Sequence, residues 1–336
     1  METIRNIEKL KVLLVDAECI TLVGHVNPDG DSIGSLMGMN GYLEEMGKVV
    51  MPVVPNNYPY FLQFLDPRRK IKIFNQSGRE VIDFIQRSDL IICMDFNALR
   101  RIDELGEVIA GTSAVKVLID HHPQPEPVFD VMYSDTGSSS TCELVYWIIK
   151  EMHSGIKLSP ESADALYTGM VTDTNNFANS VRALTFKMAG ELLEAGVDKE
   201  KIQKKVFGGF NEERMRLMGY MLYDNMKLLP RYNAGVMVLT DEIKQRFRFE
   251  EGDSEGFVNL PLSIKSVRVS ALFTQEPDCI KVSLRSKDSF SVNRFAREYF
   301  NGGGHEKAAG GKIYIPVSQV EAYFIRSIGE FMEKEK

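Results

Sequence analysis

The segment VKVLIDHHP, at residues 115–123, decides the fold of the first half of this 336-residue chain. Its apolar part is typical of a buried strand, and Asp120, His121 and His122 follow directly at the carboxyl end of that strand. Pro123 then stops the strand from continuing. Two adjacent histidines behind an apolar strand are hard to explain by packing alone. The segment therefore indicates a functional site at the end of a buried strand.

Short apolar runs alternate with helical patterns on both sides of this segment. Strands are expected at residues 21–25, 48–54, 90–94 and 115–119, and helices at 32–47, around 80–87 and around 104–110. Strands that alternate with helices at this spacing predict an α/β fold with a parallel sheet covered by helices on both faces.

After residue 139 the pattern becomes helical. Ser140 and Glu143 have the spacing of a capping box, and Ser159 followed by Pro160 marks the start of another helix. After Pro230, strands such as AGVMVL and CIKVSLR and two later helices indicate a smaller α+β domain. We therefore expect a catalytic domain at residues 1–190, a helical connector at 191–230 and a substrate-binding domain at 231–336.

The composition limits the possible partners and the compartment. The formal net charge of −7 disfavours binding to long duplex nucleic acid, which needs many Lys and Arg side chains. No run is apolar enough to span a bilayer, so no membrane partner is expected. The four cysteines form no CxxC pair, which favours reduced thiols, and the chain carries no secretory signal pattern. These features predict a cytoplasmic protein.

A second polar segment, HVNPDGDS at residues 25–32, follows the first predicted strand. A proline and a glycine inside it force a tight turn, which directs Asp29 and Asp31 toward one locus. Ligands of open α/β sheets bind outside the carboxyl ends of the strands. The alternative interpretation, for this segment alone, is a turn whose aspartates only cap a helix.

Asp95 and Asp173 extend this pattern. Asp95 follows the predicted strand at residues 90–94, and Asp173 lies at the end of an apolar helix. A carboxylate at a helix C-terminus is opposed by the helix dipole, so a compensating cation is expected there.

Carboxylates and imidazoles together predict a metal centre. The candidate ligands are His25, Asp29, Asp31, Asp95, His121 and Asp173. Oxygen-rich ligation with a few imidazoles suits Mn2+, with Mg2+ and Co2+ as alternatives. Four carboxylates neutralise two divalent ions, which favours a two-metal site with a bridging hydroxide as the nucleophile.

A glycine-rich segment in the second domain is the candidate anion site. Residues 301–305 read NGGGH, and Arg285 lies in a predicted strand upstream of them. Backbone amides of consecutive glycines can approach an anion closely, and Arg contacts phosphate through two parallel hydrogen bonds. A flexible loop is the alternative for a glycine run on its own.

These motifs resemble those of the DHH phosphoesterase superfamily, in the branch with a C-terminal DHH-associated domain. The matching segments are HVNPDGDS at 25–32, Asp95, DHH at 120–122, TDT at 172–174, VSLRS at 282–286 and GGGH at 302–305. The branch that the chain resembles contains nanoRNases that also hydrolyse 3′-phosphoadenosine 5′-phosphate. The resemblance implies a hydrolase that cleaves short oligoribonucleotides to mononucleotides, or 3′-phosphoadenosine 5′-phosphate to AMP.

The resemblance also implies a role for each matching residue. His25 and Asp29 would bind one ion, Asp31 and His121 the other, and Asp95 and Asp173 would bridge or serve both.

Two residues beside this ligand set would act in catalysis, and four in the second domain would bind substrate. Asp120 would orient an imidazole, and His122 would contact the scissile phosphate or protonate the leaving oxygen. The substrate phosphate beyond the cleaved bond would be bound by Arg285, Gly303, Gly304 and His305.

The sequence departs from the family motifs at two positions, and several alternative functions remain open. Phe96 follows Asp95 where a small residue is usual, and Asn175 follows TDT where the family usually has glycine. Alternative activities are hydrolysis of cyclic or linear dinucleotides, single-strand DNA exonuclease action and pyrophosphate hydrolysis. A nucleotide-binding regulator with a vestigial site is the alternative from another class. A homodimer is also left open.

Overall fold

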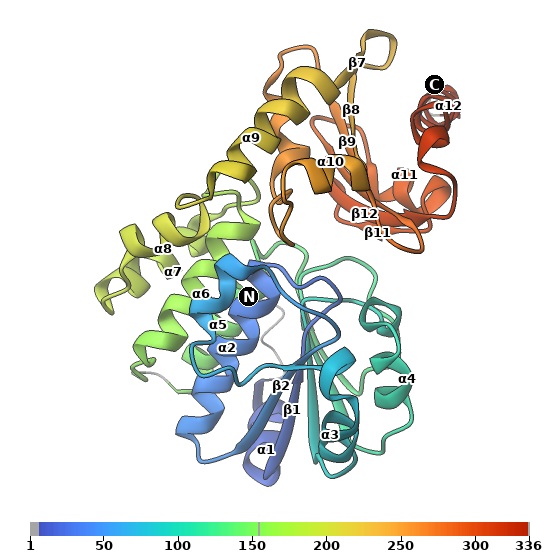
Figure 1. Cartoon of the computed structure of the whole chain (residues 1–336). Coiled ribbons are helices and arrows are strands. Elements are labelled where there is room, and N and C mark those ends of the chain that lie inside the picture. The colour runs from blue at the N-terminus through green and yellow to red at the C-terminus, as the bar shows by residue number, and fades with distance from the viewer. Residues whose placement is uncertain (1–6, 154, 335–336) are drawn as a thin grey trace. The chain divides into compact units, whose positions relative to one another are not determined.

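The computed structural model describes residues 7–153 and 155–334, and the chain divides into two compact units. Unit 1 comprises residues 1–209 and unit 2 residues 210–336. Each unit has its own sheet and its own buried core (Figure 1). The two units are therefore described one at a time.

Unit 1 is built on a six-stranded parallel sheet with the order β3-β2-β1-β4-β5-β6. The strands are β1 (Cys19–Val23), β2 (Val49–Val54), β3 (Lys72–Ile73), β4 (Leu90–Met94), β5 (Val115–Asp120) and β6 (Val131–Ser134). Central strands such as β4 are buried along their whole length, as expected of a parallel sheet that is covered on both faces.

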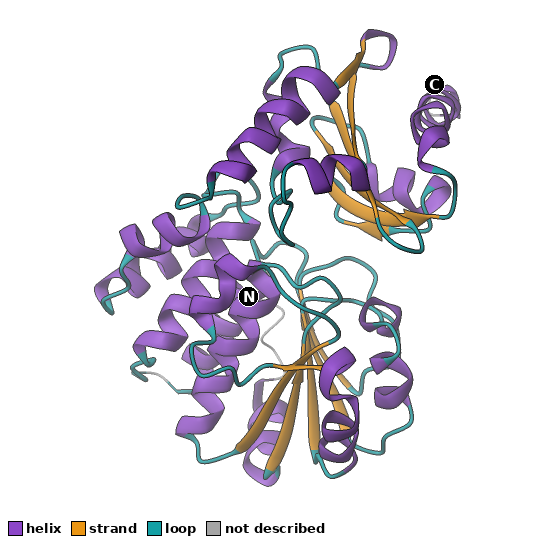
Figure 2. Ribbon diagram, viewed as in Figure 1, coloured by secondary structure: helices purple, strands orange, loops and turns teal. Residues whose placement is uncertain are grey.

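Helices cover both faces of this sheet (Figure 2). One face carries α1 (Ile7–Asp16), α2 (Gly30–Glu45), α5 (Thr141–Met152) and α6 (Pro160–Asp173). The other face carries α3 (Phe74–Gln86) and α4 (Leu105–Ala110). Alternate residues of one strand face opposite cores: Ile92 packs with the first set of helices and Cys93 with the second. The predicted α/β fold is confirmed for this unit.

Glycines let α2 and α6 pack at backbone distance. A Cβ atom added at Gly34 would lie 2.5 Å from the carbonyl oxygen of Ala165, and one added at Gly38 would lie 2.4 Å from Leu166. At Gly34 the contact is with backbone, so a side chain there requires movement of α6, whereas at Gly38 the side chain of Leu166 would have to shift. This close approach matters for function because α2 begins at Gly30 and α6 ends at Asp173, both in the candidate metal segments.

Unit 1 also contains α7 (Ala183–Glu194) and α8 (Lys199–Val206). Met188 of α7 and Ile202 of α8 are buried in the same core as α2 and α6. The chain divides between residues 209 and 210, so both helices belong to unit 1. The expected helical connector at residues 191–230 remains a prediction.

Unit 2 has a six-stranded mixed sheet with the order β11-β12-β10-β9-β8-β7. Its strands are β7 (Lys227–Leu229), β8 (Ala234–Leu239), β9 (Val269–Gln275), β10 (Ile280–Ser286), β11 (Gly303–Gly304) and β12 (Ala308–Ile313). Its helices are α9 (Glu212–Tyr220), which continues into a π-helical turn, α10 (Asp241–Arg246), α11 (Val292–Tyr299) and α12 (Val320–Lys334). Only the β8–β9 pair is parallel among the pairs described. The predicted smaller α+β architecture is confirmed.

Within residues 7–153 and 155–334, the structure has no helix that combines the length and apolarity required to traverse a bilayer.

Candidate metal centre and phosphate site

The strand order brings the segments that follow β1 and β4 to the same edge of the sheet. The order of strands reverses between β1 and β4, which are neighbours in the sheet although one ends at Val23 and the other at Met94. Ligands of open α/β sheets bind at such a reversal, outside the carboxyl ends of the strands. His25 and Asp95 follow these two strands and therefore lie at this position in the fold.

The first group of potential ligands comprises His25, Asp29 and Asp95. The Nε2 atom of His25 lies 3.4 Å from Oδ2 of Asp95 and 3.8 Å from Oδ1 of Asp29. Asp29 is also the N-cap of α2, because its Oδ1 accepts hydrogen bonds from the backbone amides of Asp31 and Ser32. The capping interpretation and the ligand interpretation therefore both fit this residue.

The second group comprises Asp31, His121 and Asp173. The Nε2 atom of His121 lies 3.7 Å from Oδ2 of Asp31 and 3.5 Å from Oδ2 of Asp173. Asp31 and His121 are buried, whereas the side chain of Asp173 is 28% exposed. Asp173 closes α6, so its carboxylate faces an imidazole at the helix end where the dipole opposes it.

Asp95 faces both groups. Its Oδ2 is directed at His25, while its Oδ1 lies 3.6 Å from Nε2 of His121 and accepts a 3.0 Å hydrogen bond from Oγ1 of Thr141. The backbone of Asp95 is left-handed, with φ of 64°, a conformation that only Gly, Asn and Asp adopt readily. Phe96, the departure from the usual motif, is fully buried in the core on the α3 side of the sheet.

The electrostatics of both groups favour protonated imidazoles when no cation is present, whereas His25 lowers the pKa of Asp29. Burial alone would lower the pKa of His25, but the carboxylates of Asp29 and Asp95 outweigh it and raise the pKa to about 10. Burial also lowers the pKa of His121, but the negative charges around it, with Asp173 first, outweigh burial and raise the pKa to about 9. Burial and the neighbouring charge of Asp31 raise the pKa of Asp95 well above its usual range. A divalent cation would relieve this repulsion and replace the protons.

The donor set fits divalent cations. Two ligand atoms about 2.1 Å from one ion lie roughly 3.0–3.5 Å apart at the usual angles. The observed separations of 3.4 and 3.8 Å in the first group, and of 3.5 and 3.7 Å in the second, are close to this range. The donors are carboxylate oxygens and imidazole nitrogens without sulfur, which suits Mn2+ or Mg2+.

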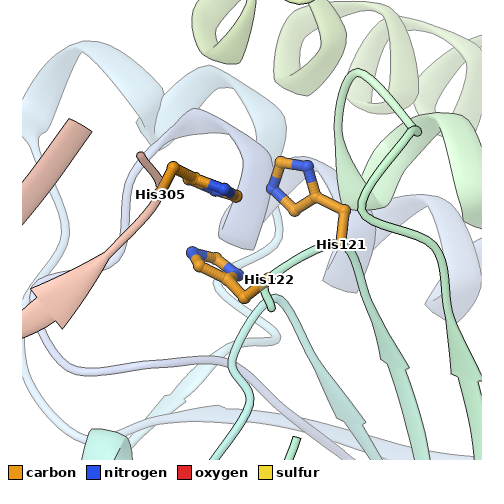
Figure 3. Close-up of side chains that lie close together, drawn as sticks. All are labelled: His121, His122 and His305. Atoms are coloured by element: carbon orange, nitrogen blue, oxygen red, sulfur yellow. The ribbon is translucent and has the colours of Figure 1, made fainter. Parts of the chain in front are cut away.

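His122 lies next to the two groups, with its Nδ1 3.9 Å from Oδ1 of Asp95, and it forms a further group of potential ligands with Asp95 and Asp120. The Nδ1 atom of His122 is 2.7 Å from Oδ1 of the buried Asp120. Burial would raise the pKa of Asp120, but the charge and hydrogen bond of His122 outweigh burial and lower it. Figure 3 shows that His121 and His122 project from the loop that follows β5, and their rings meet edge to face with centroids 5.0 Å apart. Burial lowers the pKa of His122, and the positive charge of Arg101 adds to this effect. Because Asp120 accepts the Nδ1 proton, Nε2 of the neutral ring carries the lone pair.

The start of α5 supports two of the candidate ligands, and the sequence analysis did not find this role. The backbone amides of Thr141 and Cys142 donate to the two oxygens of Asp31, at 2.7 and 2.9 Å. The carbonyl of Ser138 lies 3.3 Å from Nδ1 of His121. Sequence reasoning saw only a helix cap at Ser140, although the run of hydroxyl residues around it was the available signal.

The residues of unit 2 that the resemblance singled out lie on β10, β11 and the turn after β11. Arg285 is on the face of β10 away from the core, and its register partner on β12 is Ala308. Gly303 and Gly304 form the edge strand β11. His305 begins a tight turn, since its backbone amide donates to the carbonyl of Ala308 at 2.7 Å.

The glycine run is therefore a paired strand, not a flexible loop. A Cβ atom at Gly302 would lie 1.9 Å from the carbonyl oxygen of Gly310, so close strand packing alone requires this glycine. Two polar side chains of α11 lie beside Gly303 and were not found from the sequence. The oxygen of Asn293 and the Nε of Arg297 lie 3.6 and 3.7 Å from the position of a Cβ at Gly303, and they hydrogen-bond to each other.

Comparisons with known proteins agree with this arrangement. The model of the DHH family N-terminal domain matches residues 19–170, and that of the DHHA1 domain matches residues 234–334. The bifunctional oligoribonuclease and PAP phosphatase NrnA of Bacillus subtilis (strain 168) is 30% identical over 305 residues, covering 88% of this chain and 90% of the relative. The protein of the same name from Thermus thermophilus is 27% identical, covering 88% and 84%.

A solved structure extends the similarity to nearly the whole chain. An exopolyphosphatase-related protein from Bacteroides fragilis has a TM-score of 0.90 and 40% sequence identity, and the match covers 97% of this chain and 96% of that one. With both domain models matched in order, and with a relative 30% identical over most of its length, the chain belongs to the DHH family of phosphoesterases and carries a DHHA1 domain.

Proposed function

We propose that this chain hydrolyses short oligoribonucleotides to mononucleotides and 3′-phosphoadenosine 5′-phosphate to AMP. Two divalent ions would assist the reaction, and Mn2+ is the ion that we propose. The observation that carries the proposal is the placement of Asp95, whose two oxygens face two separate ligand groups. The NrnA relatives, named as oligoribonucleases and PAP phosphatases, support the choice of substrate.

One ion would be held by His25, Asp29 and Asp95, and the other by Asp31, His121, Asp173 and Asp95. When bound, the two ions would activate a water and stabilise the charge that develops on the phosphate. The left-handed backbone of Asp95 and the hydrogen bond from Thr141 fix the shared carboxylate before the ions arrive.

His122 would act on the reacting phosphate. The neutral ring has its lone pair on Nε2, because Asp120 accepts the proton of Nδ1. The negative charge of a phosphate would raise the pKa of His122 again, and Asp120 would stabilise the resulting imidazolium. The ring can then donate a hydrogen bond to the phosphate or a proton to the leaving oxygen.

Unit 2 would bind a second phosphate of the substrate. Arg285 offers a planar guanidinium on the strand face away from the core, and the Gly303–Gly304 strand, His305 and Arg297 supply further donors. Both proposed substrates carry a second phosphate group beside the one that is cleaved, and this site would bind it.

The test is a substrate panel with the purified full chain and Mn2+. The panel contains RNA of two to five nucleotides, 3′-phosphoadenosine 5′-phosphate, cyclic di-AMP, single-stranded DNA, pyrophosphate and a short polyphosphate. Release of mononucleotides from the RNA and of AMP from 3′-phosphoadenosine 5′-phosphate is expected. Turnover of pyrophosphate or polyphosphate alone would refute the nucleotide proposal, and turnover of cyclic di-AMP alone would assign the cyclic-dinucleotide alternative.

A further inference from the structure

Glu143, in the first turn of α5, has a fully buried carboxylate that does more than cap its helix. In a capping box this side chain would bond to the amide of the N-cap, Ser140. Instead, it accepts hydrogen bonds from the amide and hydroxyl of Ser139, at 3.2 and 2.5 Å, from Nε of Arg182 at 2.9 Å and from Oγ1 of Thr185 at 2.7 Å. A buried charge with four donors is held in one place.

On one side, this carboxylate fixes the segment that supports two metal-ligand candidates. Ser139 lies between the carbonyl of Ser138, which contacts Nδ1 of His121, and the amides at the start of α5, which hold Asp31. A shift of Ser139 would therefore move the supports of both ligands.

On the other side, it fixes the segment that follows Asp173. Four residues of this segment have left-handed backbones: Asn175, Asn176, Phe177 and Ser180. Asn adopts this conformation readily, but for Phe177 and Ser180 it persists only where the surroundings enforce it. Arg182 ends the segment and contacts both Glu143 and Asp135, and Thr185 of α7 adds a second contact to Glu143.

We propose that the Glu143–Arg182 pair is a positioning device that sets the geometry of the Asp31–His121–Asp173 group and acts on the His25–Asp29–Asp95 group only through Asp95, which faces both groups. Thr141, at the same helix start, donates a hydrogen bond to Asp95, whereas none of the hydrogen bonds described for Glu143 or Arg182 leads to His25 or Asp29. The proposal rests on the proposed function in that both groups bind cations.

The test is Mn2+ binding to the full chain, measured by calorimetry and by the electron paramagnetic resonance of free Mn2+. Glu143→Gln keeps the shape of the side chain but removes its charge and replaces one acceptor with a donor. Loss of a partner that orients metal ligands weakens metal affinity by about 10- to 100-fold. We expect the affinity for one of two Mn2+ ions to fall by that factor in Glu143→Gln and the affinity for the other to fall by clearly less.

Glu191→Gln is the matched control. Glu191 also joins α5 to α7, because its carboxylate accepts a 2.5 Å hydrogen bond from Tyr146, but it has no described contact to the ligands or their supports. This variant should bind both ions as the unmodified chain does. A general effect of loosening the α5–α7 contact would appear in both variants equally.

Arg182 provides a second variant in case Glu143→Gln does not fold. Its side chain is 30% exposed, so Arg182→Gln leaves no large cavity. Arg182→Lys keeps the charge but cannot reach Glu143 and Asp135 together, and should be intermediate. Each variant should be folded without Mn2+ by circular dichroism, and its turnover should recover as the Mn2+ concentration rises. Recovery in a variant that is unfolded without Mn2+ would instead indicate a folding defect, because bound Mn2+ also stabilises the folded state.

The outcomes separate this inference from the proposed function. If the unmodified chain binds two ions and Glu143→Gln weakens both to the same extent or neither, the positioning role is wrong while the metal centre stands. If the unmodified chain binds no Mn2+, both proposals fail. If it binds one ion, the two-ion function fails, and the positioning role stands only if Glu143→Gln weakens that ion and Glu191→Gln does not.

Discussion

Replacing Asp95 with Asn should remove the response to metal without unfolding the protein. Asn adopts the left-handed backbone at this position almost as readily as Asp, and its oxygen can still accept the hydrogen bond from Thr141. The charge that is lost is buried beside Asp31, where it is unfavourable without a cation. We therefore expect the metal-free variant to melt within about 2 °C of the unmodified chain, or above it.

The size of the stabilisation by Mn2+ follows from the thermodynamic linkage between ion binding and folding. An ion at 100 times its Kd stabilises the folded state by about 2.7 kcal/mol, and 1 kcal/mol shifts the Tm of a domain of this size by about 2–4 °C. Mn2+ should thus raise the Tm of unit 1 in the unmodified chain by roughly 5–11 °C for one ion, and by less than about 2 °C in Asp95→Asn. Loss of the shared ligand should also cost about 4 kcal/mol of transition-state stabilisation, roughly a 1,000-fold loss of kcat/KM.

The assay is thermal unfolding of the two proteins with and without Mn2+, beside turnover of 3′-phosphoadenosine 5′-phosphate. Asp89→Asn is the control, because Asp89 lies at the opposite, amino end of β4, where it accepts hydrogen bonds from two backbone amides. It should keep the full response to Mn2+. An Asp95→Asn protein with the same Mn2+-dependent rise in Tm and with turnover within about tenfold of the unmodified chain would refute the assignment of Asp95 as the shared ligand.

Four further predictions concern the groups beside Asp95 and the packing of α2. Asp120→Asn should lower kcat by about 10²-fold or more and leave Mn2+ affinity unchanged in calorimetry, because it disturbs an imidazole that is not a proposed ligand. The pKa values of about 10 for His25 and about 9 for His121 mean that Mn2+ binding at pH 7.5 should release about two protons, measurable in buffers of different ionisation enthalpy. These raised pKa values stabilise the metal-free fold fully below about pH 6.5, so its Tm should fall as the pH rises toward 9, and a flat profile would contradict them. Gly34→Ala should destabilise unit 1 by about 1–3 kcal/mol in denaturant unfolding, whereas Gly190→Ala, with nothing within 4 Å of its added Cβ, should not.

Local spacing carried the prediction of the main elements. The strand at Leu90–Met94 was predicted with its observed bounds, and α6 begins at Pro160 after the Ser159 cap, as expected. Elements without a strong local pattern were missed. The edge strand Val131–Ser134 is short, with only two of its four residues buried, and Lys72–Ile73 is a two-residue strand whose formation depends on pairing with β2.

The sequence indicated which residue types make up the candidate site but not how they are arranged in space. The sequence alone placed histidines and aspartates after strands, because a buried strand followed by polar residues is a local signal. It could not show that Asp95 directs one oxygen at each ligand group, since that depends on β1 and β4 being neighbours. It also took Glu143 for half of a capping box, because the partners Arg182 and Thr185 lie 39 and 42 residues away.

The sequence by itself determined the alternation of strands and helices, the two domain types and the chemical class of the ligands. These properties depend on periodicity and residue type, which act over a few residues. Only the tertiary structure decided which strand ends are adjacent, which carboxylate faces both groups of candidate ligands and which helix start supports those candidates. Those choices come from packing between distant segments, such as the close contact of α2 with α6, whose free energy no local pattern records.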